Sequence, residues 1–386
     1  MMRRNCLLLF TALALALDLP CALRASGTDV MQLVRLSGYE KARCMDGSQG
    51  AYYISKGDPE KFVIHLQGGG ECVDSVACGK KVHSSLGSSK YFSETFNGYQ
   101  LISAQTENAI LFNWTRIFVP YCSQDLHSGT RTTVSNSTFG FYFAGHHIFA
   151  SIVQDLLANE RLEKATDVVL TGGSAGGIGV WINIDYLQNQ IPANVVGAPI
   201  AGYYDFAYPY TGPHHTSSGL ADFREPAWPS HVSLWNSRLP AACAAHYIQR
   251  NESARCMLSR YSAPFTTARF FVIEAQTDKV QLEAHDWLPS EAQNKPIAKV
   301  YAEYMLQWRE NQSAAFNSTL KASDGFFSPA CFIHTGFSAT GPRISNISFV
   351  DAFNAWLIDD DPASPSSHHR LRDNCGLLCG NSCTGI

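Results

Sequence analysis

The sequence has few charged residues and no large excess of either sign. Only 16% of its 386 residues are Asp, Glu, Lys or Arg, and the formal net charge is -4. With 45% hydrophobic residues, this composition is that of a folded chain and excludes an extended disordered one. No basic patch stands out, so we do not expect nucleic acid as a partner. Internal repeats and low-complexity tracts are also absent, which excludes solenoid and fibrous architectures.

Long apolar runs are absent beyond the first 25 residues. The chain starts with Arg3 and Arg4, and an apolar run over Cys6–Leu17 follows, with small residues after it. This pattern predicts a signal peptide over residues 1–25 that is removed on export. A membrane anchor is the alternative, but the run is short for a bilayer. We therefore expect a secreted, monomeric protein without a transmembrane segment, in which residues 26–386 form a single catalytic domain.

Cysteine, by contrast, is plentiful, and ten cysteines remain after the leader. An even number in an exported chain predicts a disulfide framework. Zinc binding by the close pairs is the alternative, but they lack nearby histidines at finger spacing. Spacing does not determine connectivity, and the expected bridges are Cys72–Cys78, Cys379–Cys383, Cys44–Cys122, Cys243–Cys256 and Cys331–Cys375. Six N-x-S/T sequons predict a glycoprotein, and they begin at Asn113, Asn136, Asn251, Asn311, Asn317 and Asn346.

Apolar, β-branched runs alternate with helical patterns along the chain. This alternation predicts an α/β fold, a mostly parallel sheet with helices on both faces. Strands are expected at residues 62–66, 115–120, 167–170, 194–200 and 268–275. Helices are expected at residues 143–157, 176–188, 297–310 and 348–358. Residues 203–262 interrupt the pattern with aromatics and prolines, and they form either a cap inserted into the domain or an ordinary surface excursion.

The pentapeptide Gly172–Gly176 reads G-x-S-x-G between a predicted strand and a predicted helix. A serine hydroxyl is a weak nucleophile until a base removes its proton, and a sharp strand-to-helix turn exposes that hydroxyl above the sheet. The next N–H group, on Ala175, points to where an oxyanion forms, at the N-terminus of a helix. The motif therefore predicts Ser174 as a nucleophile. A glycine-rich turn that only connects two elements is the alternative.

A second glycine-rich segment, Gly68–Gly70, follows the strand expected at residues 62–66. α/β hydrolases take one oxyanion donor from such an early loop, and glycine lets the backbone approach a substrate closely. Gly69 and Gly70 are therefore candidate donors. A phosphate cradle is a poorer interpretation, because no G-K-[ST] sequence and no dinucleotide fingerprint is present. A plain loop is the remaining alternative.

In α/β hydrolases the acid and then the histidine follow the serine along the chain. Asp278 comes directly after the strand expected at residues 268–275, and its position favours it over Asp205, which follows the preceding strand. His334 lies in a short segment after a helical stretch, where Cys331 can fix the loop through a disulfide. These residues are the candidate acid and base. Other histidines after the serine are His214, His215, His231, His246, His285, His368 and His369.

Several separate motifs, in this order, resemble the pectin acetylesterase/Notum family over residues 35–385. They are L-x-G-G-G-x-C, N-W-x-R followed by Y-C, S-A-G-G and C-F-x-H, and the cysteine-rich tail resembles that of plant members. They lie at Leu66–Cys72, Asn113–Arg116 with Tyr121–Cys122, Ser174–Gly177, Cys331–His334 and Asn374–Cys383. The resemblance implies an α/β-hydrolase-like fold and cleavage of carboxylic esters without a metal or cofactor. The roles that it implies are Ser174 as nucleophile, Asp278 as acid, His334 as base, and Gly69, Gly70 and Ala175 as the oxyanion hole.

Glu71 departs from the family pattern, which usually has an aromatic residue near the third glycine. Notum-type enzymes use aromatics there to line a pocket for a lipid chain. A glutamate at this rim is costly beside a fatty tail unless it points to water, so the substrate expected is an O-acetylated polysaccharide. The helix after Ser174 is more similar to Notum, which keeps removal of a fatty acyl group, palmitoleate, from a secreted protein as the alternative. A non-catalytic binding protein on a hydrolase scaffold is the third hypothesis.

Overall fold

The computed structural model describes residues 30–103, 110–217, 220–359, 361, 369–380 and 383, and the structural statements that follow concern these residues. The predicted leader over residues 1–25 lies outside them. Within the described chain, no helix has the length and apolarity that a membrane crossing requires.

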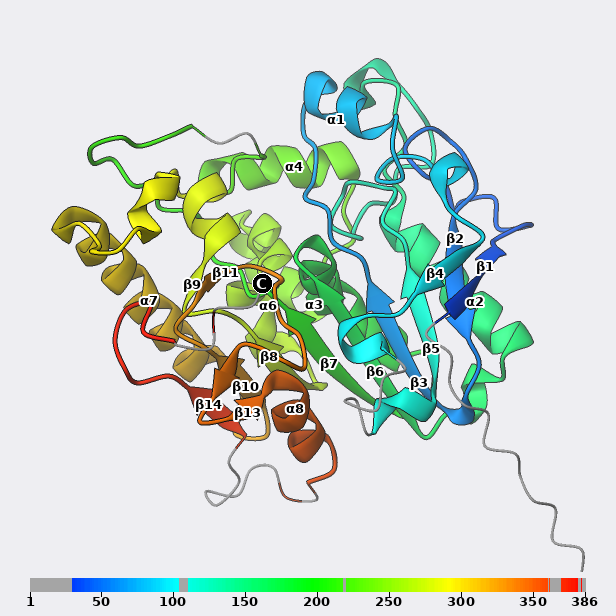
Figure 1. Ribbon diagram of the computed structural model, residues 1–386. Coiled ribbons are helices and arrows are strands. Elements are labelled where there is room, and N and C mark those ends of the chain that lie inside the picture. The colour runs from blue at the N-terminus through cyan, green and yellow to red at the C-terminus, as the bar shows by residue number, and fades with distance from the viewer. Residues whose placement is uncertain are drawn as a thin grey trace, which may run out of the picture.

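A 10-stranded sheet forms the centre of the molecule, in the order β14-β10-β8-β7-β6-β3-β5-β2-β1-β4 (Figure 1). Its strands are β1 (Val30–Arg35), β2 (Ala51–Ser55), β3 (Asp58–Leu66), β4 (Thr95–Asn97), β5 (Trp114–Val119), β6 (Asp167–Gly173), β7 (Asn194–Ile200), β8 (Arg269–Ile273), β10 (Gly325–Ser328) and β14 (Arg370–Arg372). From β14 to β5 every neighbouring pair is parallel. The strands β2, β1 and β4 extend this edge in antiparallel pairing. The predicted mostly parallel sheet is therefore confirmed.

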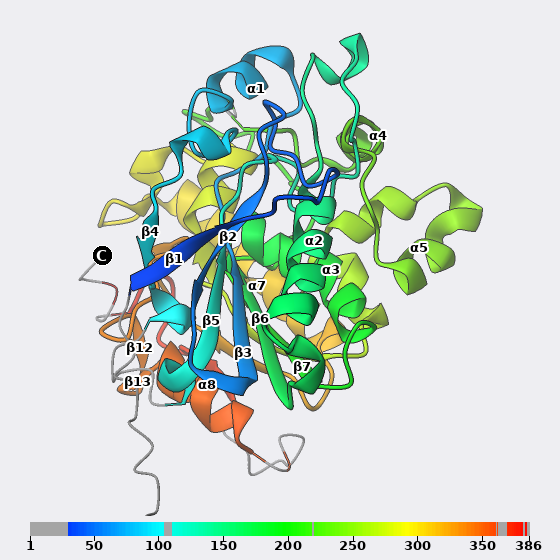
Figure 2. The same ribbon diagram turned by 90° about the vertical axis from the view of Figure 1, so that its right-hand side faces the viewer.

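Helices cover both faces of the sheet. The larger ones are α2 (Gly145–Asn159), α3 (Ala175–Gln188), α7 (Lys299–Thr319) and α8 (Phe349–Leu357). Figure 2 shows α2 and α3 on one face and α8 on the other. The alternation of side chains along β8 explains this arrangement. Phe270 stacks on Trp181 of α3 with ring centroids 3.8 Å apart, whereas the next residue, Phe271, contacts Phe353 and Trp356 of α8.

Shorter helices and strands lie in the segments between these elements. They are α1 (Ser75–Lys81), α4 (Trp228–Trp235), α5 (Ala241–Tyr247), α6 (Ser259–Ser262), β9 (Thr277–Asp278), β11 (Phe332–Ile333), β12 (Arg343–Ile344) and β13 (Ile347–Ser348). In Figure 1, α1 and α4 lie together above the sheet. The Trp235 indole N–H donates to the Cys72 carbonyl over 3.1 Å and joins these two regions. The helices α4 to α6 belong to the segment 203–262, whose role as a cap stays a prediction.

Five disulfides fix the loops, and three of them are as predicted. The two predicted pairings of the tail are wrong. Pairing of β14 with β10 returns the tail to the end of β10, where the Gly380 N–H donates to the Ala330 carbonyl. This places Cys383 beside Cys331, with 5.6 Å between their Cα atoms. The bridges observed in place of the predicted ones are Cys331–Cys383 and Cys375–Cys379. All ten cysteines are bridged, so zinc binding by the close pairs is excluded.

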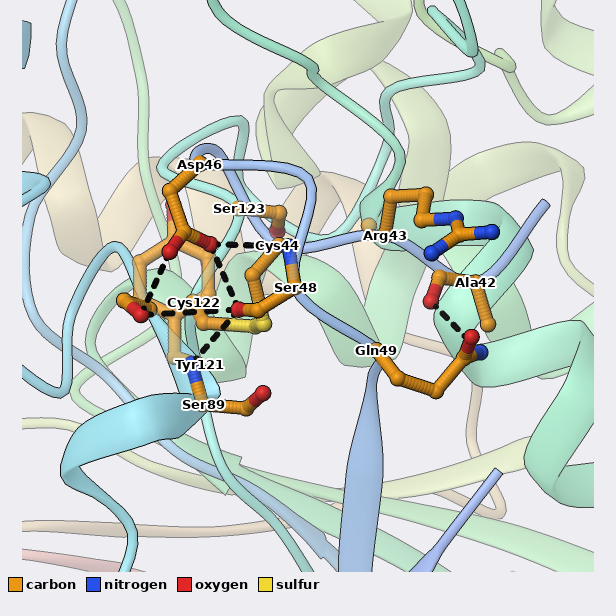
Figure 3. The surroundings of a disulfide bond; sticks show 12 residues. Ala42, Arg43, Cys44, Asp46, Ser48, Gln49, Ser89, Tyr121, Cys122 and Ser123 are labelled. Atoms are coloured by element: carbon orange, nitrogen blue, oxygen red, sulfur yellow. Dashed lines mark hydrogen bonds between the residues drawn. A yellow bond between two sulfur atoms is a disulfide. The ribbon is translucent and has the colours of Figure 1, made fainter. Parts of the chain in front are cut away.

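The Cys44–Cys122 disulfide joins the segment before β2 to the segment after β5 (Figure 3). Beside it, Asp46 accepts hydrogen bonds from the hydroxyls of Ser48 and Ser88. Burial alone would raise the pKa of Asp46, but hydrogen bonds from Ser48, Lys90 and Ser88 outweigh it and hold that pKa at about 2. These contacts join residues 88–90, which follow α1, to the turn that precedes β2.

Gly197 in β7 provides a test of the packing between the sheet and α3. A Cβ added there would lie 2.4 Å from the ring of Phe270, which is itself stacked on Trp181. We expect Gly197→Ala to lower the free energy of unfolding by about 1–3 kcal/mol, the usual cost of overpacking. The control is Gly79→Ala, because a Cβ on Gly79 meets no atom within 4 Å and alanine favours the helix α1. Urea unfolding of both variants checks this, and equal stabilities would contradict it.

Candidate active site

Ser174 stands between β6 and α3, at the carboxyl edge of the sheet. Its backbone has φ 56° and ψ -123°, a conformation that persists only where the surroundings impose it. The flanking glycines have no room for side chains. A Cβ on Gly172 would lie 2.6 Å from the Gly176 carbonyl oxygen, and one on Gly176 would lie 2.0 Å from that of Leu66. G-x-S-x-G thus forms the sharp strand-to-helix turn that the sequence predicts.

The glycine-rich loop after β3 packs directly against this turn. Leu66 is opposite Gly172 in the register of β3 and β6, so the residues beyond the two strands lie side by side. A Cβ on Gly68 would lie 2.4 Å from the Gly173 carbonyl oxygen and 2.9 Å from the Cβ of Ser174. The sheet register therefore places the two predicted motifs in contact.

The candidate oxyanion donors lie around the serine. Gly69 and Gly70 line the same cavity as Ser174 and have φ values of 148° and 73°. A positive φ of this kind favours glycine. Their N–H groups have no backbone acceptor in the described chain. Ala175 is the first residue of α3, where helix N–H groups lack intrahelical acceptors.

The short strands β9 and β11 bring the predicted acid and base together. They pair in parallel with Asp278 opposite Ile333, so the next residue, His334, lies beside Asp278. The Nδ1 of His334 donates to Asp278 Oδ2 over 2.7 Å. The backbone N–H of Gln281 donates to the other carboxylate oxygen over 2.9 Å. Asp278 is fully buried, and the carboxylate therefore fixes both the position and the tautomer of the imidazole.

Ser174 and His334 line one cavity of about 950 Å³. With Nδ1 bonded to Asp278, Nε2 of His334 is the proton-accepting nitrogen, and it has no hydrogen-bond partner among the described residues. The nucleophile, acid and base candidates thus meet at a single place, with Nε2 free to accept a proton. Other residues that line the cavity are Leu86, Tyr99, Gln100, Leu220, Thr335 and Phe337.

Two buried polar side chains, Tyr204 and Glu71, lie near the site but do not line the cavity that contains Ser174. The hydroxyl of Tyr204 lies close to the side chain of Ser174, and burial raises the pKa of this tyrosine well above 10.0. Glu71 was expected at the rim, but it is only 5% exposed. Its carboxylate accepts a hydrogen bond from Ala221 N over 3.1 Å, which gives it an internal partner instead of water. Burial raises the pKa of Glu71 to about 7, against the opposing effects of Ala221 and Lys81.

A second carboxyl group, that of Glu274, lies directly beneath the acid candidate and was missed from sequence. Glu274 is fully buried, accepts a hydrogen bond from Tyr203 N over 2.9 Å, and is hydrogen-bonded to Asp278. Burial and then the charge of Asp278 raise the pKa of Glu274 well above 4.5. Two carboxyl groups can share a hydrogen bond only if one carries the proton, so Glu274 is the neutral donor. The one available signal is an acidic residue inside an apolar strand.

Asp205, His214 and His215 lie apart from this arrangement. Asp205 is 3.9 Å from the guanidinium of Arg260 and accepts a hydrogen bond from its own neighbour's N–H. His214 and His215 are exposed in the segment 203–262. His368 lies outside the described residues. The chain order of serine, acid and histidine therefore selects residues that lie together, and the competing acid does not contact His334.

Glu274→Gln is expected to stabilise the folded protein at pH 8 and to leave its stability almost unchanged at pH 4. The glutamate ionises near 4.5 in the unfolded chain but keeps its proton when folded, so stability falls as the pH rises above 4.5. Between the pKa values of Glu274 in the unfolded and the folded state, the free energy of unfolding falls by about 1.4 kcal/mol for each pH unit. Glutamine cannot ionise and still donates to Asp278. Melting temperatures at pH 4, 6 and 8 test this, with the exposed Glu291→Gln as control, and a pH-independent difference would contradict it.

Known proteins are similar to this chain over most of its length. It matches the family described as Pectinacetylesterase over residues 24–384. Pectin acetylesterase 11 of Arabidopsis thaliana is 26% identical over 369 residues, which cover 89% of this chain and 90% of that protein. Palmitoleoyl-protein carboxylesterase NOTUM of Schmidtea mediterranea is 27% identical over 339 residues, covering 84% of this chain. The matched segment spans only 62% of the length of that planarian relative.

A solved structure of the Wnt deacylase Notum from Drosophila has a TM-score of 0.77 to this chain at 23% identity. It covers 92% of this chain and 99% of its own, and this likeness establishes the fold. The predicted α/β-hydrolase-like fold is thus confirmed. The relatives carry the names of ester-cleaving enzymes, which agrees with the prediction of a carboxylic ester hydrolase. Because the family match extends over nearly the whole chain, the protein belongs to the pectinacetylesterase family.

Proposed function

We propose that the protein is an exported serine esterase that removes O-acetyl groups from a polysaccharide. The observation that carries this proposal is a strained serine that shares one open cavity with a carboxylate-bound histidine and has polar side chains behind it. The names of the Arabidopsis relatives support the same substrate class. The residues that act are Ser174, His334 and Asp278, with Gly69, Gly70 and Ala175 as oxyanion donors.

In the first half of the reaction, Ser174 Oγ attacks the carbonyl carbon of the ester. His334 Nε2 takes the hydroxyl proton, and Asp278 stabilises the imidazolium that forms. The carbonyl oxygen becomes an oxyanion, and the nearby N–H groups stabilise it. The carbon–oxygen bond to the sugar then breaks, the sugar hydroxyl leaves with the proton from His334, and the acetyl group stays on Ser174.

In the second half, water attacks the acetylated Ser174. His334 Nε2 accepts a proton from that water, and the oxyanion forms again at the same N–H groups. The bond between the acetyl carbon and Oγ breaks, and the proton returns to Oγ. Acetic acid leaves, which ionises in solution, and the free enzyme is restored without any cofactor.

The polar groups behind Ser174 support a small acyl group. Tyr204 is buried close to the serine, and the buried carboxylate of Glu71 accepts a hydrogen bond from the N–H of Ala221. A long hydrocarbon chain entering this space would displace these side chains or leave their polar atoms without partners. An acetyl group needs no such space.

The size of the cavity supports a large alcohol part in the substrate. A volume of about 950 Å³ is far more than an acetyl group fills, so most of it is available to sugar units. At the edge of the cavity, Tyr99 is 37% exposed, and its hydroxyl is fixed to His65 Nε2 over 3.0 Å. The face of such an anchored ring offers apolar contact to the C–H groups of a sugar.

Removal of a palmitoleoyl group from a protein is the second candidate function. The planarian and Xenopus relatives bear that activity in their names. Apolar side chains of Leu86, Leu220 and Phe337 also line part of the cavity, where a longer acyl chain would find contact. The two candidates share the same mechanism and differ in the length of the acyl group.

Export is part of the proposal as well. The predicted leader supports it, and so do five disulfides, which form and persist in oxidising compartments. The names of the Arabidopsis and planarian relatives agree with the two candidate substrates, acetylated pectin and a palmitoleoylated protein.

Ser174→Ala is expected to lower the rate of p-nitrophenyl acetate hydrolysis at least about 1000-fold, because the nucleophile is lost. The matched control is Ser85→Ala, since Ser85 lines the same cavity and its exposed hydroxyl has no role in the mechanism. Release of acetate from acetylated pectin should follow the same order. Full activity in Ser174→Ala would overturn the assignment of the nucleophile.

The length of the acyl chain separates the two candidate substrates. The wild-type protein is expected to prefer C2 over C8 and C16 p-nitrophenyl esters in kcat/KM by at least about tenfold. Tyr204→Ala opens space behind the serine and should raise activity on C8 relative to C2, because each buried CH₂ is worth about 0.8 kcal/mol. Tyr204→Phe keeps the ring and should keep the preference for C2. A wild-type preference for C16 would overturn the acetyl proposal in favour of the palmitoleoyl one.

A further inference from the structure

Lys81 is the last residue of α1, and its side chain reaches the glycine-rich loop. Its ammonium group donates a hydrogen bond to the carbonyl oxygen of Gly69 over 2.9 Å. The helix itself is fixed close to that loop. Asp74 caps its first turn, and the Cys72–Cys78 disulfide joins it to the residue that follows the glycines by two positions. The helix that carries the Lys81 ammonium group is therefore firmly anchored beside the glycine-rich loop.

The hydrogen bond determines the orientation of one peptide plane. A trans peptide is planar, so the carbonyl of Gly69 and the N–H of Gly70 point in opposite directions. With its carbonyl held by Lys81, this peptide directs the Gly70 N–H away from the ammonium group. Gly69 and Gly70 both line the cavity that contains Ser174, and the N–H of Gly70 has no backbone acceptor in the described chain.

The two glycines make such a support necessary. Glycine adopts positive and negative φ with similar ease, and Gly69 and Gly70 have φ values of 148° and 73°. The peptide between them can therefore rotate with little steric resistance unless an outside group holds it. A cation on the carbonyl also polarises the peptide, which makes its N–H a stronger donor.

We propose that Lys81 is a positioning residue, which holds the Gly69–Gly70 peptide so that the Gly70 N–H stabilises the oxyanion. This inference rests on the proposed esterase function, because it assigns a role within the same site. Lys81 does not touch the substrate in this arrangement, and it acts through the backbone alone. The proton, acyl and leaving-group steps are unchanged.

The neighbouring lysine provides a matched control. Lys80 is also in the last turn of α1 and is exposed, so it has the same favourable position relative to the helix dipole. Removing its charge tests any general effect of positive charge on α1. Only Lys81 bonds to the glycine loop.

Lys81→Met is expected to lower kcat for p-nitrophenyl acetate by about 10- to 100-fold, less than the roughly 100- to 1000-fold cost of losing a donor outright. Both halves of the reaction pass through an oxyanion, so kcat falls whichever half limits the rate. KM should change less than about twofold. Lys81→Arg should recover most of the loss, and Lys80→Met should equal the wild type.

Inhibition by a trifluoromethyl ketone tests the oxyanion site directly, because a purely structural role of Lys81 would leave the inhibition constant unchanged. The ketone adds to the serine and forms an oxyanion, so its inhibition constant should rise in Lys81→Met by about the same factor as kcat falls. The melting temperature should stay close to that of the wild type. If Lys81→Met does not fold, the comparison of Lys81→Arg with Lys80→Met carries the test.

The outcomes distinguish the two proposals. An inactive wild-type protein on p-nitrophenyl acetate overturns the esterase proposal and the role of Lys81 with it. An active wild type with unchanged kcat in Lys81→Met overturns the role of Lys81 alone. A loss of kcat without a matching loss of ketone affinity also overturns it, because the oxyanion site would then be intact.

Discussion

The arrangement of this site depends on one close approach, between the backbone that follows β3 and the turn that follows β6. Leu66 and Gly172 are paired in the central, parallel part of the sheet. Gly176 approaches the Leu66 carbonyl so closely that a Cβ would lie 2.0 Å from it. The hydrogen-bonded ladder of the sheet therefore holds the glycine loop and the serine turn together. A methyl group in this contact would separate the proposed nucleophile from the N–H groups, which is why the sequence has glycine on both sides.

The acid and the base depend on a second and much smaller pairing. β9 and β11 contribute two residues each, too few for a ladder to be stable alone. Other interactions support this pair. The hydroxyl of Thr277 donates to the Cys331 carbonyl over 2.8 Å, and the Cys331–Cys383 disulfide fixes the same strand. The central sheet thus holds Ser174 and the glycine loop, whereas side-chain contacts and a disulfide hold Asp278 and His334.

The elements that sequence predicts well are those whose pattern is local. The strand at residues 194–200 is observed with the same bounds, and G-x-S-x-G is contained in five residues. The strands β1, β2 and β4 were not predicted, because exposed residues weaken the apolar pattern of β1 and β4 and the buried strand β2 has only five residues. The pairing of Cys331 with Cys383 depends on how the sheet edge returns the tail across 52 residues. Glu274 was missed because its contact with Asp278 exists only after β8 and β9 are in place.

The likeness to a Notum structure concerns the scaffold, and the proposal of a short acyl group rests on buried polar side chains near Ser174. A fatty chain gains about 0.8 kcal/mol for each CH₂ that it buries. Each buried polar group that loses its partner costs about 1–3 kcal/mol, so a chain that displaced Glu71 from the N–H of Ala221 would lose about that much. The first few CH₂ groups would therefore only offset that cost. An acetyl ester incurs no such cost, which is why we propose a short acyl group on a scaffold that also occurs in a Wnt deacylase.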